Sequence, residues 1–103
     1  STAVEYSVTT STKVYNGKDN TLKFSSAKAN GKLVIVFKNY TFNKVVINAK
    51  TFGSDKSSLS VNSSASQNLT ASNNDYTFVL TSGVSTLTIN ATKRCYITSI
   101  TLL

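Results

Sequence analysis

Residues 76–90 decide the fold of this chain, and their sequence is YTFVLTSGVSTLTIN. The segments 76–80 and 86–90 have the alternating or β-branched pattern of strands, in which every second side chain turns toward a core. Ser82-Gly83 separates the two segments with a turn signal. Short segments of this kind with turns between them are typical of an all-β sandwich or barrel.

The rest of the chain repeats this pattern. No window sustains the spacing of an amphipathic helix, although one helical turn is an alternative to a loop over 25–30. Val4, Tyr6 and Val8 fall on one face of a first strand, and Asn16-Gly17 indicates a tight turn after 13–15. About 8–9 strands are expected in all, the others lying over 21–24, 33–37, 45–47, 59–61, around Leu69, and over 76–80, 86–90 and 95–103.

Two segments carry more specific expectations. The run 33–37 is apolar throughout, which predicts a central strand buried on both faces or lying at a sheet crossing. In 95–103 the apolar positions change phase between Ile97 and Ile100, as they do at a β-bulge. We therefore predict an antiparallel β-sandwich of jelly-roll type that forms a single module over 1–103.

The composition excludes most enzyme mechanisms. The chain has no His and one Cys, so it lacks a Ser-His or Cys-His nucleophile pair, an imidazole metal ligand and a disulfide framework. Acid–base catalysis by carboxylates needs two of them across a cleft, whereas Glu5, Asp19, Asp55 and Asp75 are scattered. Cys95 has no His or carboxylate near it in the sequence and is predicted to be a buried core residue. We expect no enzyme.

The net charge of +7 favours anionic partners through long-range electrostatics. The ten lysines are spread along the chain without a basic run, however, and Arg94 is the single Arg. Proteins that read nucleic acid usually cluster Arg residues. The distribution therefore disfavours specific nucleic-acid binding and leaves incidental polyanion binding at low salt.

The ends and the composition predict a location. The sequence has no apolar stretch long enough to span a membrane, and Ser1-Thr2-Ala3 does not open a signal peptide. A start without Met and ends that resemble mid-chain boundaries predict a module excised from a longer multidomain protein. The 16 Ser, 15 Thr and 11 Asn beside a single Cys fit a secreted bacterial protein. The expected location is extracellular or on the bacterial cell surface.

The aromatic residues near turns are the best candidates for ligand binding. Sugar rings stack on exposed aromatic faces, while Asn and Lys side chains form hydrogen bonds with their hydroxyls. Tyr40, Asn43, Lys50 and Phe52 combine these groups and are the predicted ligand-binding residues. The alternative is that Tyr40 and its neighbour Phe42 close one open end of the sandwich.

A structural calcium ion is the one cofactor considered. Calcium needs six to eight oxygen ligands from carboxylates and loop carbonyls. Asp19, followed by Asn20, together with Asn74 and Asp75 lies in predicted turns and could supply some of them. The alternative is that these side chains cap their own turns.

The second half of the chain resembles a known class of modules. The segments that carry the resemblance are NKVVINAK (43–50), SLSVN (58–62), YTF (76–78), TLTI (86–89) and RCYITSITL (94–102). They resemble accessory jelly-roll domains, galactose-binding-like or carbohydrate-binding-module-like, of secreted multidomain proteins from gut and low-GC bacteria. The resemblance implies a non-catalytic module, and such domains often stack sugar on Trp or Tyr and often hold a structural calcium. This chain has no Trp.

Together these observations predict a non-catalytic extracellular module that binds carbohydrate or attaches a larger secreted protein to a surface. Its expected partners are a polysaccharide or glycan and the rest of the parent polypeptide. Two alternatives stay open. One is a structural spacer or interaction domain without a ligand, and the other is a polyanion-binding module that holds an attached nuclease on DNA.

Overall fold

The computed structural model describes residues 3–103 as an all-β structure. Ser1 and Thr2, on which part of the signal-peptide expectation rests, lie outside the described residues. The structure contains ten strands against the 8–9 predicted, and the shortest of them, β2 and β7, have three and two residues. Residues 25–30 form a loop with bends and no helical turn. Within 3–103, no helix is long and apolar enough to cross a membrane.

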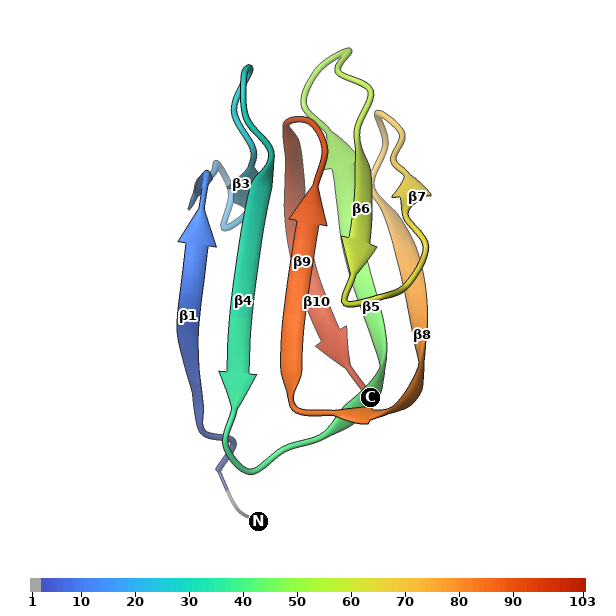
Figure 1. Cartoon of the computed structure of the whole chain (residues 1–103). Helices are drawn as coiled ribbons and strands as arrows, with labels where there is room; N and C mark the ends of the chain where they lie inside the picture. Colours follow the sequence, from blue (N-terminus) through green and yellow to red (C-terminus); the bar gives the residue numbers. More distant parts are fainter. Residues whose placement is uncertain (1–2) are drawn as a thin grey trace.

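The strands form two five-stranded antiparallel sheets that pack face to face (Figure 1). The order in the first sheet is β1-β4-β9-β6-β7, with bounds Tyr6–Thr12, Gly31–Phe37, Thr86–Ala91, Ser58–Val61 and Gln67–Asn68. The order in the second sheet is β2-β3-β10-β5-β8, with bounds Val14–Asn16, Leu22–Phe24, Cys95–Leu102, Phe42–Thr51 and Asn74–Val84.

The connections confirm the predicted jelly-roll type. Only the β2–β3 and β6–β7 hairpins join neighbours within one sheet, and every other connection passes from one sheet to the other. Crossing connections separate strands that are consecutive in the sequence, so most paired strands are distant in the chain. The loops therefore gather at the two ends of the sandwich, and the end that carries the β3–β4, β5–β6, β7–β8 and β9–β10 loops is at the top of Figure 1.

The core lies between the sheets and follows the alternation seen in the sequence. In β9, Leu87, Ile89 and Ala91 are almost fully buried, while the polar residues between them face outward. In β8, Phe78 is 2% exposed and its neighbour Val79 is 69% exposed. Burying a side chain of this size stabilises a fold by about 1.5–3 kcal/mol, so these alternating strands supply much of the driving force.

The prediction that 33–37 is buried on both faces is wrong. This segment is part of β4, a central strand, and Leu33 faces the core. Val36 is 36% exposed, because the outer face of a two-layer sandwich has no further layer above it. The predicted bulge is confirmed, since the register of β10 against β5 shifts between Ile97 and Ser99. This shift brings Ile100 back toward the core.

The predicted turn at Ser82-Gly83 is also wrong, because β8 continues to Val84. The turn signal marks an irregularity within the strand: Val84 pairs with Phe42, while Val79 already pairs with Lys44. The extra residues of β8 bulge out between these two pairs.

The first strand is more exposed than its pattern suggests. Val4, Tyr6 and Val8 are 48%, 64% and 53% exposed. The strands β2 and β3 at the corresponding edge of the second sheet are three residues long, whereas β1 has seven. The second sheet is therefore too short to cover this part of the first.

Candidate ligand-binding face

The four predicted binding residues do not form one site. Asn43 and Lys50 lie near opposite ends of β5, and seven residues of extended strand separate them by about 23 Å. Tyr40 precedes β5 and Phe52 follows it. The structure therefore divides the set into a pair at each end of the sandwich.

Tyr40 takes the alternative role, closing one end of the sandwich. It packs against the core, and its hydroxyl donates a hydrogen bond to the backbone carbonyl of Leu102 at 3.1 Å. Its ring stacks on Phe42 at 6.3 Å and meets the edge of Phe37 at 6.0 Å. Phe42 itself is 2% exposed. Asn43 is exposed beside these packed rings and lies far from Lys50 and Phe52.

Lys50 instead belongs to a row of side chains across the outer face of the second sheet. Tyr96 on β10 pairs with Lys23 on β3 and with Lys50 on β5, and Lys23 pairs with Tyr15 on β2. We call these four residues, Tyr15, Lys23, Tyr96 and Lys50, the outer row. They face away from the core because the residues next to them, including Phe24, Ala49 and Cys95, are fully buried.

Phe52 and Arg94 extend the outer row toward the loops. The Phe52 ring lies 5.5 Å from that of Tyr96. Lys23 Nζ lies 4.6 Å from the centre of the Phe52 ring, and Arg94 Cζ lies 4.4 Å from it. Lys50 Nζ lies 6.0 Å from the centre of the Tyr96 ring. The two rings therefore hold three cations, each exposed contact contributing about 0.5–1 kcal/mol.

Tyr15 is the ring of the row that is most open to a ligand. It is 47% exposed, and no other ring of residues 3–103 stacks on it. Tyr96 is half-buried, and the backbone of Gly17 lies close to its ring, because a Cβ atom at this glycine would lie 3.3 Å from Cδ1 of Tyr96. The outer row thus presents one open ring and one half-buried ring with a lysine beside each.

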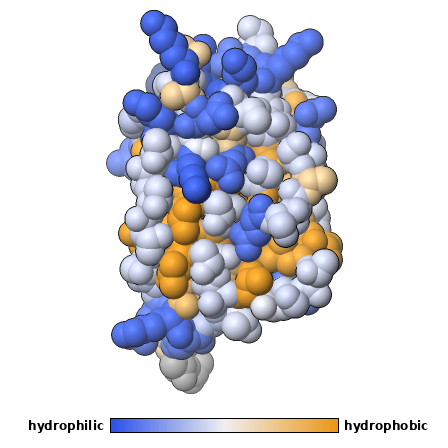
Figure 2. Space-filling model, viewed as in Figure 1, coloured by the Kyte–Doolittle hydropathy of each residue, from blue (hydrophilic) through white to orange (hydrophobic). Residues whose placement is uncertain are grey.

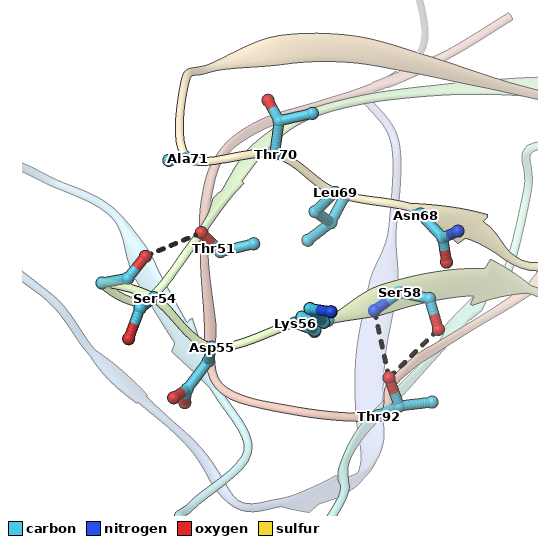
Figure 3. A pocket seen from close by; sticks show the side chains of 12 residues that line it. Thr51, Ser54, Asp55, Lys56, Ser58, Asn68, Leu69, Thr70, Ala71 and Thr92 are labelled. Carbon is cyan, nitrogen blue, oxygen red and sulfur yellow. Dashed lines mark hydrogen bonds between the residues drawn. The ribbon is translucent and has the colours of Figure 1, made fainter.

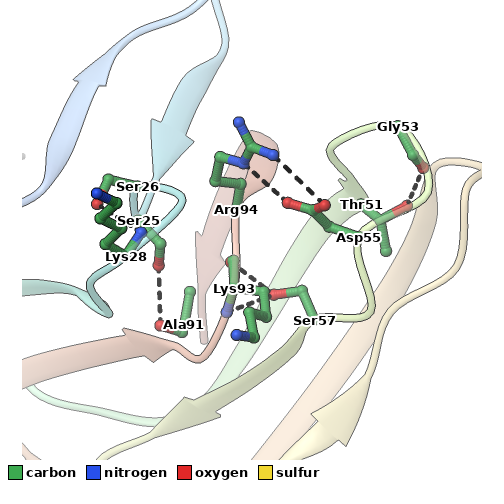
Figure 4. A network of polar contacts seen from close by, with 10 residues as sticks. All are labelled: Ser25, Ser26, Lys28, Thr51, Gly53, Asp55, Ser57, Ala91, Lys93 and Arg94. Carbon is green, nitrogen blue, oxygen red and sulfur yellow. Dashed lines mark hydrogen bonds and ion pairs between the residues drawn. The ribbon is translucent and has the colours of Figure 1, made fainter.

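The charges in this region are unevenly paired. Arg94 donates to both oxygens of Asp55, at 2.8 Å from Nε and 3.5 Å from Nη2 (Figure 4). Both side chains are more than a quarter exposed, so this ion pair contributes less than about 1 kcal/mol to stability. Its role is to neutralise Arg94. Lys23 and Lys50 have no carboxylate partner in the part of the chain that the structure describes.

Two loops that carry this cluster are tied together by one backbone hydrogen bond and by two bonds of the Ser57 hydroxyl. The amide of Phe52 donates to the carbonyl of Arg94 at 3.2 Å. The Ser57 hydroxyl donates to the carbonyl of Lys93 at 2.7 Å and accepts from the amide of Lys93 at 3.2 Å (Figure 4). Because both loops are fixed to each other, Phe52 and Arg94 are held in place before any ligand binds.

A polar cleft lies beside the β5–β6 loop (Figure 3). Its volume is about 480 Å³, and its lining includes Thr51, Asp55, Lys56, Thr70 and Thr92. The Thr92 hydroxyl already bonds the amide and the hydroxyl of Ser58, each at 3.0 Å. None of the residues that line this cleft is aromatic, so it offers no platform for a sugar ring, and the outer row is the stronger candidate.

The predicted calcium ligands lie apart. Asp19 is in the β2–β3 loop at one edge of the second sheet, and Asn74 and Asp75 are on β8 at the opposite edge. Four strand spacings separate these edges, about 19 Å, so the three residues cannot share one ion. Asp75 instead accepts a hydrogen bond from Asn48 at 2.9 Å. No group of three or more His, Cys, Asp or Glu that could hold a metal occurs over 3–103.

The backbone at Asp19 and Asn20 fits the alternative to calcium binding, in which these side chains cap their own turn. Asp19 and Asn20 both adopt left-handed backbone conformations, with φ of 57° and 61°, which Asx residues tolerate in turns.

Cys95 is fully buried, as predicted. Burial raises the pKa of its thiol to about 12, although a hydrogen bond with Ser57 opposes the shift. A thiol with this pKa is protonated at neutral pH and is a poor nucleophile.

No protein-family model and no curated protein sequence matches this chain. A solved structure of a family two carbohydrate esterase from Cellvibrio japonicus is similar to it, with a TM-score of 0.58 and 9% sequence identity. The alignment covers 97% of this chain and 33% of that one, so this chain spans about a third of the length of that protein. The likeness establishes a shared β-sandwich fold.

Proposed function

We propose that this chain is a non-catalytic carbohydrate-binding module, and that its ligand lies across the outer row. The observation that carries the proposal is the alternation of tyrosine and lysine over four adjacent strands, Tyr15, Lys23, Tyr96 and Lys50. A tyrosine ring offers an apolar face and a hydroxyl to a sugar, and a lysine offers three hydrogen-bond donors. The fold likeness to a carbohydrate esterase supports this class of ligand by analogy.

The dimensions of the outer row favour a chain of sugars over a single one. Four strands at a spacing of about 4.8 Å span about 14 Å. The backbones of Tyr15 and Tyr96 are two spacings apart, about 10 Å. The surface is the open face of a sheet, which suits a polysaccharide lying along it better than a small molecule that needs to be enclosed.

The chemistry of the chain supports a binding role over a catalytic one. The sequence has no His. Of the carboxylates at this end of the second sheet, Asp55 is engaged by Arg94, and Asp75 accepts a hydrogen bond from Asn48. Cys95, the only thiol, is buried and protonated. These features offer neither a His-activated nucleophile nor a reactive thiol. Such a module would serve in an extracellular or cell-surface protein by keeping its parent polypeptide on a polysaccharide.

The test is a binding measurement with matched tyrosine variants. Affinity electrophoresis in gels that contain soluble polysaccharides, neutral and acidic, compares the native chain with Tyr15→Ala and Tyr6→Ala. Tyr6 is the control because it is also an exposed tyrosine, 64% accessible, but lies on the other sheet. We expect retardation of the native chain and of Tyr6→Ala in at least one gel, and loss of it in Tyr15→Ala. Equal retardation of both variants, or none for the native chain, would refute the proposal.

A further inference from the structure

We infer that the polysaccharide is acidic, with a carboxylate on its repeating sugar; this inference rests on the proposed binding function. It starts from Lys23 and Lys50, which lie on either side of Tyr96 in the outer row. Both are half-buried, and both ammonium groups lie within cation–π distance of an aromatic ring. Two ordered cations without a carboxylate partner among residues 3–103 form a site prepared for anions.

The surroundings of the outer row reinforce the positive charge. The loops at this end of the sandwich, including the β1–β2 connection, carry Lys13, Lys28, Lys56, Lys93 and Arg94. Asp55, the acidic residue of these loops, is paired with Arg94. The other carboxylate at this end is Asp75 near the start of β8, which accepts a hydrogen bond from Asn48, so the cations outnumber the carboxylates. Figure 2 shows hydrophilic side chains gathered at this end, above the apolar stripes of the first sheet. A neutral sugar would gain nothing from this field, whereas an anionic polymer would be attracted over a long range.

The spacing along the outer row is compatible with a polymer that carries regularly repeated charges. Tyrosines and lysines alternate at steps of one strand, so the two lysines lie two strand spacings apart, about 10 Å between their backbones. A polyuronate carries one carboxylate on each sugar ring, and a sugar ring is about as long as one strand spacing, so every second carboxylate can meet a lysine. A lysine bonds such a group as a compact charge with three donors and does not need the planar fork of an arginine.

Nucleic acid fits the same surface less well. Readers of nucleic acid use free arginines and a basic groove that follows the phosphates. Here Arg94 is held by Asp55, and the two unpaired lysines lie about 10 Å apart on an open sheet face. The observations therefore favour an acidic polysaccharide.

The experiment compares one polymer with and without its charge. Isothermal titration calorimetry measures binding of the native chain to polygalacturonate and to the same polymer after full methyl esterification, with dextran sulfate and a single-stranded oligothymidylate as further probes. We expect saturable binding to polygalacturonate that is at least about tenfold tighter than to the ester, which corresponds to about 1.4 kcal/mol. Equal affinity for the ester would overturn the inference and leave the proposed function standing. Binding to none of the polysaccharides would refute both.

Two lysine variants locate the effect. Lys50→Ala is expected to weaken binding to polygalacturonate several-fold, and Lys50→Glu more strongly. Lys44→Ala is the matched control, because Lys44 is on the outer face of the same strand but at its far end. Equal losses in Lys50→Ala and Lys44→Ala would overturn the assignment, as would tighter binding of the native chain to dextran sulfate or to the oligothymidylate. Circular dichroism and the Tm of each variant establish that it is folded.

Discussion

Replacing Ser25 by Ala tests how the end of the sandwich that carries the proposed binding face is held together. Ser25 follows β3 directly, is fully buried, and has a φ of 67°. Its hydroxyl donates to the carbonyl of Ala91 at 2.9 Å and accepts from the amide of Gly31 at 2.7 Å. Through these bonds it joins the β3–β4 loop to the end of β9, as Figure 4 shows for its bond to Ala91.

The expected loss in the free energy of unfolding follows from the two backbone groups that the substitution leaves unpaired. Gly31 and Ala91 are both buried, so water cannot easily replace the hydroxyl. Each buried unpaired group costs about 1–3 kcal/mol, and the expected loss from Ser25→Ala is about 2–4 kcal/mol in the free energy of unfolding. For a domain of this size the corresponding decrease in Tm is about 10–20 °C.

The assay is urea unfolding followed by far-UV circular dichroism. We expect the urea concentration at the midpoint of unfolding to fall, while the slope of the unfolding free energy against urea concentration stays unchanged. Ser25→Gly removes the same hydrogen bonds but relieves the left-handed backbone, so its loss is smaller by about 1 kcal/mol. Ser63→Ala, at an exposed loop position, is the control and changes stability by less than about 0.5 kcal/mol. A loss below about 1 kcal/mol for Ser25→Ala would refute the reasoning.

Three further predictions concern Tyr40 at the closed end of the sandwich, the thiol of Cys95 and the binding of calcium. Tyr40→Phe should lower the free energy of unfolding by about 1 kcal/mol, because the hydrogen bond to Leu102 is missing. Tyr40→Ala should lower it by about 3 kcal/mol, and neither variant should change the affinity for polysaccharide. Weaker binding with unchanged stability would instead make Tyr40 a ligand-binding residue. Because the folded pKa of Cys95 is about 12 against 9.0 for the free thiol, its contribution to stability is complete below pH 9 and is lost as the pH rises toward 12. Unfolding of the native chain at pH 8 and pH 10.5 should therefore differ more than that of Cys95→Ala, and identical differences would contradict the burial argument. Millimolar calcium should leave the Tm unchanged, because Asp19 and Asp75 lie at opposite edges of one sheet; a rise in Tm would show a site that this arrangement does not explain.

The strands were predictable because the alternation of apolar and polar residues that identifies a strand lies within a few consecutive positions. Leu87 and Ile89 alternate with threonines, so period two alone identifies β9 and its buried face. The phase change between Ile97 and Ile100 identified the bulge for the same reason. Gly83 was misleading because glycine accompanies a bulge within a strand as well as a turn between strands.

The outer row was not predictable, because it depends on which strands lie side by side. Lys23 and Tyr96 are far apart in the sequence and become neighbours only through the pairing of β3 with β10. The sequence does place both on outer faces, since each alternates with buried residues, but it contains no signal for the register. Without the register, nearness in sequence grouped Tyr40 and Asn43 with Lys50, although they lie at opposite ends of the sandwich.

The proposed binding of an acidic polysaccharide across the outer row can be followed residue by residue by backbone NMR. In a titration with galacturonate oligosaccharides, we expect the amide signals of Tyr15, Lys23, Lys50 and Tyr96 to shift progressively and saturate together. The signals of Tyr6 and Lys44, on the other sheet and at the far end of β5, should stay in place. Shifts centred on the cleft beside Thr70 and Thr92, or no shift at all, would contradict the account.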